Sequence, residues 1–314
     1  MQRDTPPRVV VLGAGAMGSV YAGLLADGDA EVVAVTRNSQ HCAAINEHGL
    51  RVEGASGDRR VQLHAVGSTA GLRADLVVVA VKANDIAAVA GQIAPMMHAE
   101  TIVVALQNGL GSAELLAERI GSERLAVGIA GGFGARLVAP GHVYHSGMQR
   151  IRIGAYAGLD PTALEAVVEK WDAAGFSVEQ ANNIQVMQWE KLICNVAFSA
   201  PCTLTGLTVG EALNDAHIGP LSLNAAEEAR TIALALGVEV QIPDCEAHVR
   251  KFASAVMGAK PSMLLDHEAM RPSEIDVING AVPRQALKAG LTAPINATLT
   301  RLVKHRESAF AINR

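Results

Sequence analysis

The sequence predicts an α/β fold: a doubly wound parallel sheet followed by an all-helical C-terminal domain. Short β-branched runs alternate with Ala- and Leu-rich helical runs over the first 180 residues or so. The β-branched runs are almost continuously apolar, as strands buried on both faces of a parallel sheet require. After residue 181 the strand patterns end and only long helical patterns follow, which indicates a second, helical domain.

Each element of the first half has its own signal. Strand patterns occur as RVVVL at 8–12, EVVAVT at 31–36, DLVVVAV at 75–81 and TIVVAL at 101–106. Helical patterns lie among them as SVYAGLLADG at 19–28, DIAAVAGQIAPMM at 85–97 and SAELLAERI at 112–120. A glycine-rich alternating segment at 125–156 predicts antiparallel strands at one edge of the sheet. A helix near 161–174 and a strand at 176–181 complete the domain.

The second half consists of helical patterns. They extend over about 183–206, 217–236, 243–258, 273–289 and 294–309. The polar pair Asn182-Asn183 separates them from the last strand. We therefore predict two domains, residues 1–182 and residues 183–314.

Composition limits the partners. The 314 residues are 50% hydrophobic and 18% charged, with a net charge of −5, a pI near 6.1 and only 3% aromatic residues. Long basic runs are lacking, which argues against nucleic acid and anionic membrane surfaces. The apolar N-terminal run is interrupted by glycines, which argues against a signal peptide, and no stretch is long and apolar enough to span a bilayer.

The four cysteines, Cys42, Cys194, Cys202 and Cys245, form no CxxC pair. Their spacing suits neither a disulfide framework nor a zinc site. We expect reduced thiols in a cytoplasmic protein and no metal ion.

Positions 13–18 form a GxGxxG turn between a predicted strand and a predicted helix. In that context the first glycine permits the tight turn, the second lets the backbone approach a pyrophosphate, and the third lets helix pack on strand. The helix N-terminus supplies an anion site. An ordinary strand-to-helix turn is the alternative to a dinucleotide site. The residues of the turn are Gly13, Ala14, Gly15, Ala16, Met17 and Gly18.

The residues that follow the strands indicate which dinucleotide binds. The second strand ends in Thr36-Arg37-Asn38, where a carboxylate would favour NAD and an arginine suits the 2′-phosphate of NADP. A solvated loop side chain is the alternative for Arg37. Lys82 and Asn108 follow two further strands, at the edge where open α/β sheets bind ligands.

The apolar stretch QWEKLICNVAFSAPC at 188–202 contains a polar stripe. Lys191, Asn195 and Ser199 are spaced by four, so their side chains fall within roughly 80° on a helix, with Gln188 in the same arc. A lysine among packed apolar neighbours loses hydration, so its charge needs a hydrogen-bond or ion-pair partner, or a functional role. The alternative is that Lys191 extends its ammonium to the surface.

An ordered set of motifs resembles the ketopantoate reductase family, the NADPH-dependent 2-dehydropantoate 2-reductases. The resemblance covers almost the whole chain and implies a Rossmann-type domain joined to a helical domain, with NADPH as cofactor and a 2-oxo acid as substrate. The motifs are GAGAMG, VKA, QNG, WEKLICN, PSMLLDHEAMRPSEIDVINGAV and KHRESAF.

The resemblance also implies residue roles. Lys191 is the general acid, and Glu274 lies near the substrate and the nicotinamide ribose. A protonated lysine suits the reaction because hydride arriving at a 2-oxo carbon leaves negative charge on the carbonyl oxygen. A solvated acid in the first turn of a helix is the alternative for Glu274.

The remaining implied roles concern binding. Asn195 orients substrate and lysine, Ser262 binds substrate, Asn108 contacts the junction of cofactor and substrate, and Lys82 contacts the cofactor. From the residues alone, Ser262 also fits the N-cap of the helix MLLDHEAM.

Three positions depart from the family pattern. Ser199 stands where members commonly carry asparagine, and Val209 and Ala259 stand where some members use asparagine for substrate. The leading prediction is reduction of ketopantoate to pantoate. The alternatives are a paralogue that reduces another 2-oxo acid and a non-catalytic NADP-binding protein. A homodimer remains open.

Overall fold

The computed structural model describes residues 7–28, 30–147 and 150–310. Its contacts divide the chain into two compact units. We call the first, residues 1–107 and 112–184, the sheet unit, and the second, residues 108–111 and 185–314, the helical unit. The short segment Asn108–Gly111 therefore groups with the helices, although both of its neighbours in sequence belong to the sheet unit.

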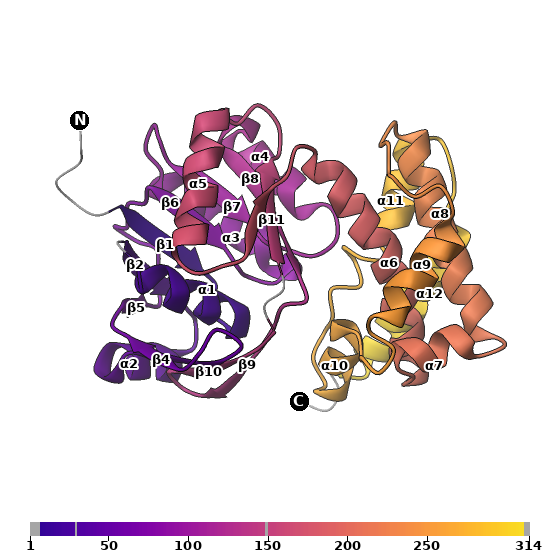
Figure 1. Cartoon of the computed structure of the whole chain (residues 1–314), viewed down its shortest axis with the longest axis horizontal. Helices are drawn as coiled ribbons and strands as arrows, with labels where there is room; N and C mark the ends of the chain where they lie inside the picture. The colour runs from indigo at the N-terminus through magenta and orange to yellow at the C-terminus, as the bar shows by residue number, and fades with distance from the viewer. Residues whose placement is uncertain (1–6, 29, 148–149, 311–314) are drawn as a thin grey trace. The chain divides into compact units, whose positions relative to one another are not determined.

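The sheet unit is built on one mostly parallel sheet of eight strands, as predicted (Figure 1). The strand order is β12-β11-β8-β7-β6-β1-β2-β5, and the pair β8–β11 is antiparallel whereas the other neighbours are parallel. The central strands are fully buried, which explains their continuous apolar sequence. The strands are β1 (Arg8–Leu12), β2 (Glu31–Val35), β5 (His64–Val66), β6 (Leu76–Val79), β7 (Ile102–Ala105), β8 (Leu125–Gly131), β11 (Arg150–Ala155) and β12 (Val178–Gln180).

Helices connect these strands. Figure 1 shows α5 beside β11, and α5 also contacts β12. α2 is a helix that was not predicted from the sequence; it begins where the side chain of Asn38 accepts a hydrogen bond from the His41 backbone N–H at 3.0 Å. The helices are α1 (Ala16–Ala26), α2 (Ser39–His48), α3 (Ile86–Ile93), α4 (Ser112–Ile120) and α5 (Pro161–Ala173), with 3-10 turns η1 (Ala83–Asp85), η2 (Ala94–Met96) and η3 (Ser122–Arg124).

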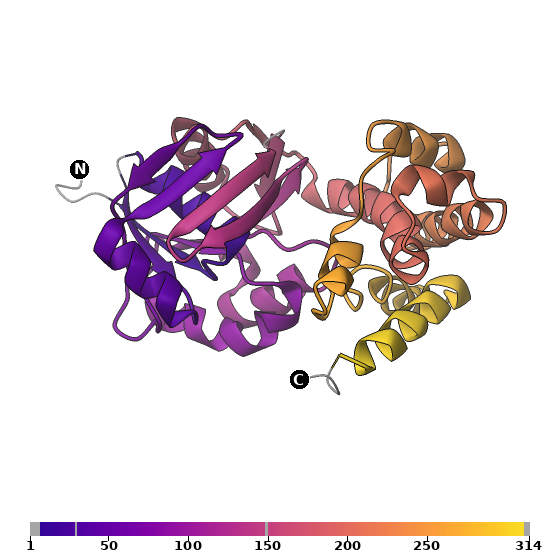
Figure 2. The same cartoon turned by 90° about the horizontal axis from the view of Figure 1, so that it is seen from below.

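The glycine-rich segment at 125–156 is distributed over two sheets, which corrects part of the prediction. β8 and β11 are antiparallel near one edge of the main sheet, but β9 (Gly134–Ala139) and β10 (His142–Gly147) join a second sheet of order β4-β3-β10-β9 (Figure 2). The other strands of that sheet are β3 (Leu50–Gly54) and β4 (Arg59–Val61). Residues 148 and 149, within the predicted segment, and residues 1–6, in the N-terminal run, lie outside the described residues.

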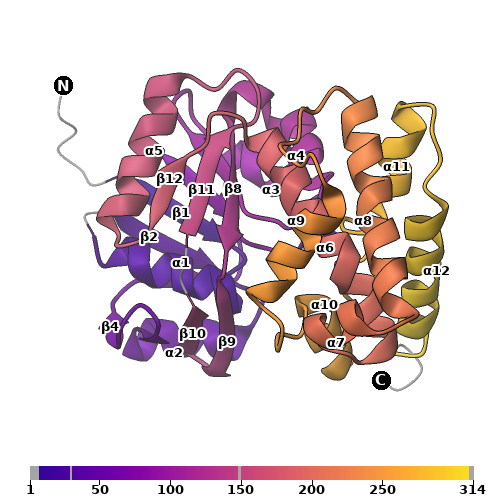
Figure 3. The same ribbon diagram turned by 45° about the vertical axis from the view of Figure 1, so that its right-hand side comes forward.

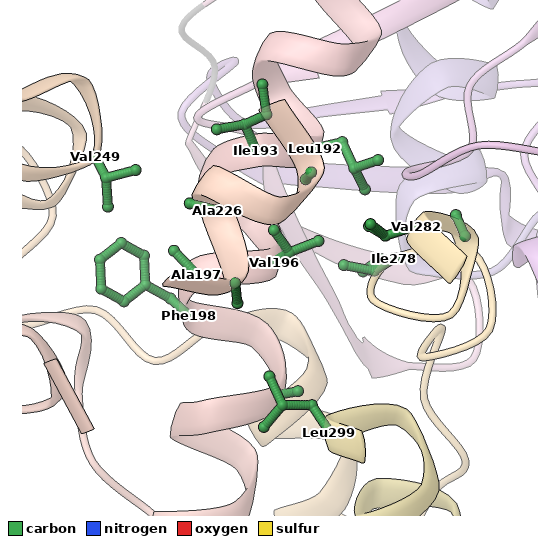
Figure 4. Packing of buried hydrophobic residues seen from close by; sticks show 14 of the residues in the cluster. Leu192, Ile193, Val196, Ala197, Phe198, Ala226, Val249, Ile278, Val282 and Leu299 are labelled. Carbon is green, nitrogen blue, oxygen red and sulfur yellow. The ribbon is translucent and has the colours of Figure 1, made fainter. Parts of the chain in front are cut away.

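The helical unit packs around α6 (Ile184–Thr205). Figure 4 shows Val196 facing Ile278 and Val282, and Phe198 facing Val249, and all of these side chains belong to one buried cluster. Figure 3 shows α8 and α12 side by side, as their contacts require. The other helices are α7 (Val209–Asn214), α8 (Ile218–Ala235), α9 (Cys245–Ser254), α10 (Ser262–Glu268), α11 (Ala281–Lys288) and α12 (Pro294–Ser308).

One predicted helix, 273–289, is only half right. α11 begins at Ala281, and residues 273–280 form a run of bends and turns that we call the Glu274 turn. Its Glu274 carbonyl accepts from the Val277 and Ile278 N–H groups at 3.1 Å, but two other carbonyl groups bond to distant partners. The Val277 carbonyl accepts from the Leu110 N–H at 2.9 Å, and the Asp276 carbonyl accepts from the Arg284 guanidinium. Because these acceptors have distant partners, an apolar pattern with helical spacing does not become a helix here.

Across the described ranges, none of the helices combines the length and the apolar sequence needed to cross a membrane.

Candidate active site

The GxGxxG turn has the geometry that its sequence predicts. Gly13 has φ +99°, and a Cβ there would lie 2.5 Å from Cγ1 of Val81. A Cβ on Gly18 would collide with the Gly13 carbonyl oxygen. A Cβ on Gly15 would meet nothing within 4 Å, so the backbone there is open to a ligand. Gly13 and Gly18 thus serve the fold, and Gly15 leaves room for a group that approaches closely.

The start of α1 suits an anion. Gly15 is its N-cap, no side chain caps it, and its first turn carries no acidic residue. The first N–H groups of a helix lack intrahelical acceptors and carry partial positive charge. The turn and the helix start therefore fit the pyrophosphate of a dinucleotide, because they combine free approach with backbone donors.

Arg37 lies just past the end of β2 and is solvent-exposed. Its side chain is 85% exposed and pairs with Asp85, Nη2 to Oδ2, at 3.0 Å. Asp85 follows β6, and β1 lies between β2 and β6, so the pair crosses above the end of the strand that leads into the GxGxxG turn. An exposed ion pair contributes at most about 1 kcal/mol. A phosphate can therefore compete with Asp85 for the guanidinium. Lys82, just before η1, is also exposed.

Gln107 is a residue that the sequence analysis did not select. Its Nε2 donates to the carbonyl groups of Val79 at 2.8 Å and Val81 at 3.0 Å, so it ties the end of β7 to the end of β6. Its buried Oε1 has no hydrogen-bond partner among the described residues. The signal available in the sequence was an amide immediately before Asn108, at the end of a buried strand.

Lys191, Asn108 and Glu274 form a connected group within the helical unit. The Lys191 ammonium donates to Oδ1 of Asn108 at 2.8 Å, and Nδ2 of Asn108 lies 3.4 Å from Oε2 of Glu274. Burial lowers the pKa of Lys191 from 10.5 to about 8, and the Glu274 carboxylate opposes this by raising it. The bond to Asn108 and the burial of the ammonium argue against the alternative of a lysine that reaches solvent. Lys191 is therefore a partly buried cation held in place by an amide.

Backbone geometry brings Asn108 to this group. Gly109 has φ +77°, and a Cβ there would collide with the Val277 carbonyl oxygen. The next residue, Leu110, donates its N–H to that same oxygen at 2.9 Å. The segment that carries Asn108 thus lies directly against the Glu274 turn, and only glycine fits at the point of closest approach.

The other predicted substrate residues lie on two helices. Asn195 and Ser199 follow Lys191 at successive turns of α6; Asn195 is half-buried and Ser199 is 5% exposed. Ser262 is exposed on α10. Its alternative role as an N-cap is wrong, because Pro261 occupies the cap and no side chain bonds there. The alternative for Glu274 is also wrong, since that residue precedes α11 and lies in a turn.

Two of the departures from the family pattern are neighbours. Val209 donates its N–H to the Ala259 carbonyl at 3.0 Å, with Val209 buried in the core and Ala259 exposed. Val209 and Ala259 therefore lie at the same place in the helical unit. Having valine and alanine there instead of asparagine lowers the polarity of that one region.

Within the part of the chain that the structure describes, no three His, Cys, Asp or Glu side chains gather as a metal site would require. The four cysteines are free thiols. His142 and His145 bond to different partners, Glu53 at 2.9 Å and Ser56 at 3.0 Å.

Comparisons with known proteins agree with this arrangement. Two models of the ketopantoate reductase PanE/ApbA family match, one over residues 9–158 and one for the C-terminal part over residues 183–307. A 2-dehydropantoate 2-reductase of Archaeoglobus fulgidus is 31% identical, covering 96% of this chain and 99% of its own length. A solved PanE/ApbA family ketopantoate reductase of Ralstonia eutropha has TM-score 0.87 at 30% identity, with 97% and 99% of the two chains covered. A D-mandelate dehydrogenase solved with NADH also has TM-score 0.87, at 25% identity, with 96% and 99% covered.

Proposed function

The chain belongs to the ketopantoate reductase PanE/ApbA family, and we propose that it reduces a 2-oxo acid to a 2-hydroxy acid with NADPH. 2-Dehydropantoate is the substrate that the relatives favour. The observation that carries the proposal is the Lys191–Asn108 bond of 2.8 Å, in which a partly buried lysine with a pKa of about 8 is held near Glu274.

Lys191 is the proposed general acid. With a pKa of about 8 it is mostly protonated near neutral pH, yet it gives up its proton more readily than an ordinary lysine. Its ammonium stabilises negative charge on the carbonyl oxygen of the substrate and donates its proton to that oxygen. Asn108 holds the ammonium through Oδ1, and Glu274 maintains its charge. Asn195, Ser199 and Ser262 are the proposed substrate contacts.

The proposed cofactor is NADPH, which when bound would supply the hydride. The open approach at Gly15 and the uncapped start of α1 support a bound pyrophosphate. Arg37 supports binding of the 2′-phosphate. On binding, its guanidinium would exchange the ion pair with Asp85 for one with the phosphate. Ala14, Ala16 and Met17 complete the proposed turn, and Lys82 and Asn108 are proposed further contacts. The division into an NADP-binding domain, residues 1–182, and a catalytic domain, residues 183–314, is part of this proposal.

The experiment is an NADPH oxidation assay across 2-oxo acids: ketopantoate, 2-oxoisovalerate, which lacks its hydroxymethyl group, and benzoylformate, which carries a ring. The proposal expects turnover of at least one acid with NADPH, and ketopantoate with the highest kcat/KM. A clear preference for another acid would identify a paralogue. NADPH binding without turnover of any acid would identify a non-catalytic NADP-binding protein and overturn the proposal.

Location and assembly complete the proposal. We place the enzyme in the cytoplasm, in keeping with four free thiols. A homodimer is one alternative for its assembly, and light scattering on the purified chain distinguishes it from a monomer.

A further inference from the structure

The Glu274 turn has some internal backbone bonds, such as those from the Val277 and Ile278 N–H groups to the Glu274 carbonyl, but no continuous helical ladder. Other elements also hold it. One anchor is Glu307 on α12, whose side chain is 15% exposed. Its Oε1 accepts three hydrogen bonds: from the Ser273 N–H at 2.8 Å, from the Ser273 hydroxyl at 2.6 Å and from Nε2 of His267 at 3.0 Å. One carboxylate oxygen thus fixes the residue immediately before Glu274 by both its backbone and its side chain.

A second anchor comes from the same helix. Lys304 lies three residues before Glu307, so the two side chains share one face of α12. Its Nζ donates to both carboxylate oxygens of Asp276, at 2.9 and 3.0 Å. This pair is about half exposed and therefore weak, whereas the Glu307 contacts are largely buried. Glu274 lies between the two anchored residues, and Glu307 provides the stronger hold.

We propose that Glu307 is a positioning residue for the reduction: by holding Ser273 it places the Glu274 carboxylate beside Asn108, and through Asn108 beside the Lys191 ammonium. This inference rests on the proposed function. Glu307 touches none of the reacting groups itself. Its contacts are Ser273, within the turn, and His267, from α10.

The chemical consequence concerns Lys191. The Glu274 carboxylate raises the pKa of Lys191 against the effect of burial. If the turn loosens, Glu274 moves away, the pKa of Lys191 falls, and less of the lysine is protonated at neutral pH. The Asn108–Glu274 contact is 3.4 Å long and would lengthen further. A displacement of about 1 Å at a catalytic group can lower the rate by roughly 100-fold.

The experiment compares three variants with the wild type, using NADPH and the best 2-oxo acid over a range of pH. Glu307→Leu removes the acceptor, Glu307→Gln retains an oxygen at the same place, and Glu246→Leu removes a carboxylate from an exposed ion pair with Arg250 on α9. We expect Glu307→Leu to lose roughly 10- to 100-fold in kcat, with less change in KM. The alkaline limb of its profile of kcat against pH should move to lower pH. Glu307→Gln and Glu246→Leu should stay within a few-fold of the wild type, with unchanged limbs.

A folded Glu307→Leu with wild-type kcat and an unmoved alkaline limb would overturn the inference. So would equal losses in Glu307→Leu and Glu307→Gln, because these would indicate a role for the charge and not for the acceptor. If Glu307→Leu does not fold, Ser273→Ala removes the 2.6 Å bond from the Ser273 hydroxyl to Glu307 and should shift the alkaline limb in the same direction. An unmoved limb in that variant would equally overturn the inference.

A second readout does not depend on turnover. The pH dependence of Lys191 acetylation by acetic anhydride, followed by mass spectrometry, reports the pKa of that lysine directly. A lower pKa in Glu307→Leu but not in Glu307→Gln supports the positioning role even if no 2-oxo acid tested is reduced. An unchanged Lys191 pKa in an enzyme that does reduce 2-oxo acids contradicts the positioning role and leaves the proposed function intact.

Discussion

Replacing Lys191 by methionine should change the pH dependence of stability by an amount that follows from its burial. The folded chain lowers the pKa of Lys191 from 10.5 to about 8. Between those two pH values the unfolded chain keeps the proton and the folded chain has lost it. The free energy of unfolding therefore rises with pH across this window, at no more than about 1.4 kcal/mol per pH unit.

The full effect is about 3 kcal/mol, since each pKa unit is equivalent to about 1.4 kcal/mol. Below pH 8 the wild type carries the buried ammonium in its folded state and is destabilised by it. Above pH 10.5 the lysine is neutral in both states and the effect is gone. The unfolding free energy of the wild type minus that of Lys191→Met should rise by about 3 kcal/mol over this range, because methionine does not titrate.

Urea denaturation at several pH values from 7 to 10.5 measures this difference. Trp189 lies beside Lys191 on α6 and is buried, so its fluorescence reports the helical unit. Trp171, in α5 of the sheet unit, is replaced by phenylalanine in both proteins to remove its signal. Other titrating groups act equally in the two proteins and cancel. A difference that stays constant within about 0.5 kcal/mol would refute the assignment of a depressed Lys191 pKa.

Three further outcomes are expected. Arg37→Ala should weaken NADPH binding by about 10- to 100-fold and NADH binding far less, as titration of each cofactor would show; equal losses would mean that Arg37 does not bind the 2′-phosphate. Ser199→Asn should raise kcat/KM for ketopantoate relative to 2-oxoisovalerate, because asparagine offers a longer donor and acceptor; a flat ratio would mean that position 199 does not contact the substrate hydroxyl. Gly109→Ala should lower kcat by tenfold or more, because a Cβ would collide with the Val277 carbonyl and displace Asn108. Wild-type kcat in that variant would show that the turn yields without moving Asn108.

The elements whose signals are local could be predicted from the sequence. Fully buried parallel strands need continuous β-branched runs, so β1, β2, β6 and β7 were evident. The GxGxxG turn was evident because its glycine spacing stands between a strand pattern and a helix pattern. The polar stripe of α6 followed from helical periodicity alone, since an interval of four keeps Lys191, Asn195 and Ser199 on one face. In each case the signal lies in a run of neighbouring residues.

Only the tertiary structure decided where those pieces meet. The Lys191–Asn108 bond joins residues 83 apart in sequence, and the Asn108–Glu274 contact joins residues 166 apart. The Glu274 turn has a helical pattern, yet the carbonyl groups of Val277 and Asp276 bond to Leu110 and Arg284, donors that no local pattern identifies. β9 and β10 pair in the second sheet and not in the main sheet, because strand pairing depends on which strand edge lies close enough in space. Local sequence sets what each segment can form, and long-range hydrogen bonds select which of those structures forms and which side chains become a site.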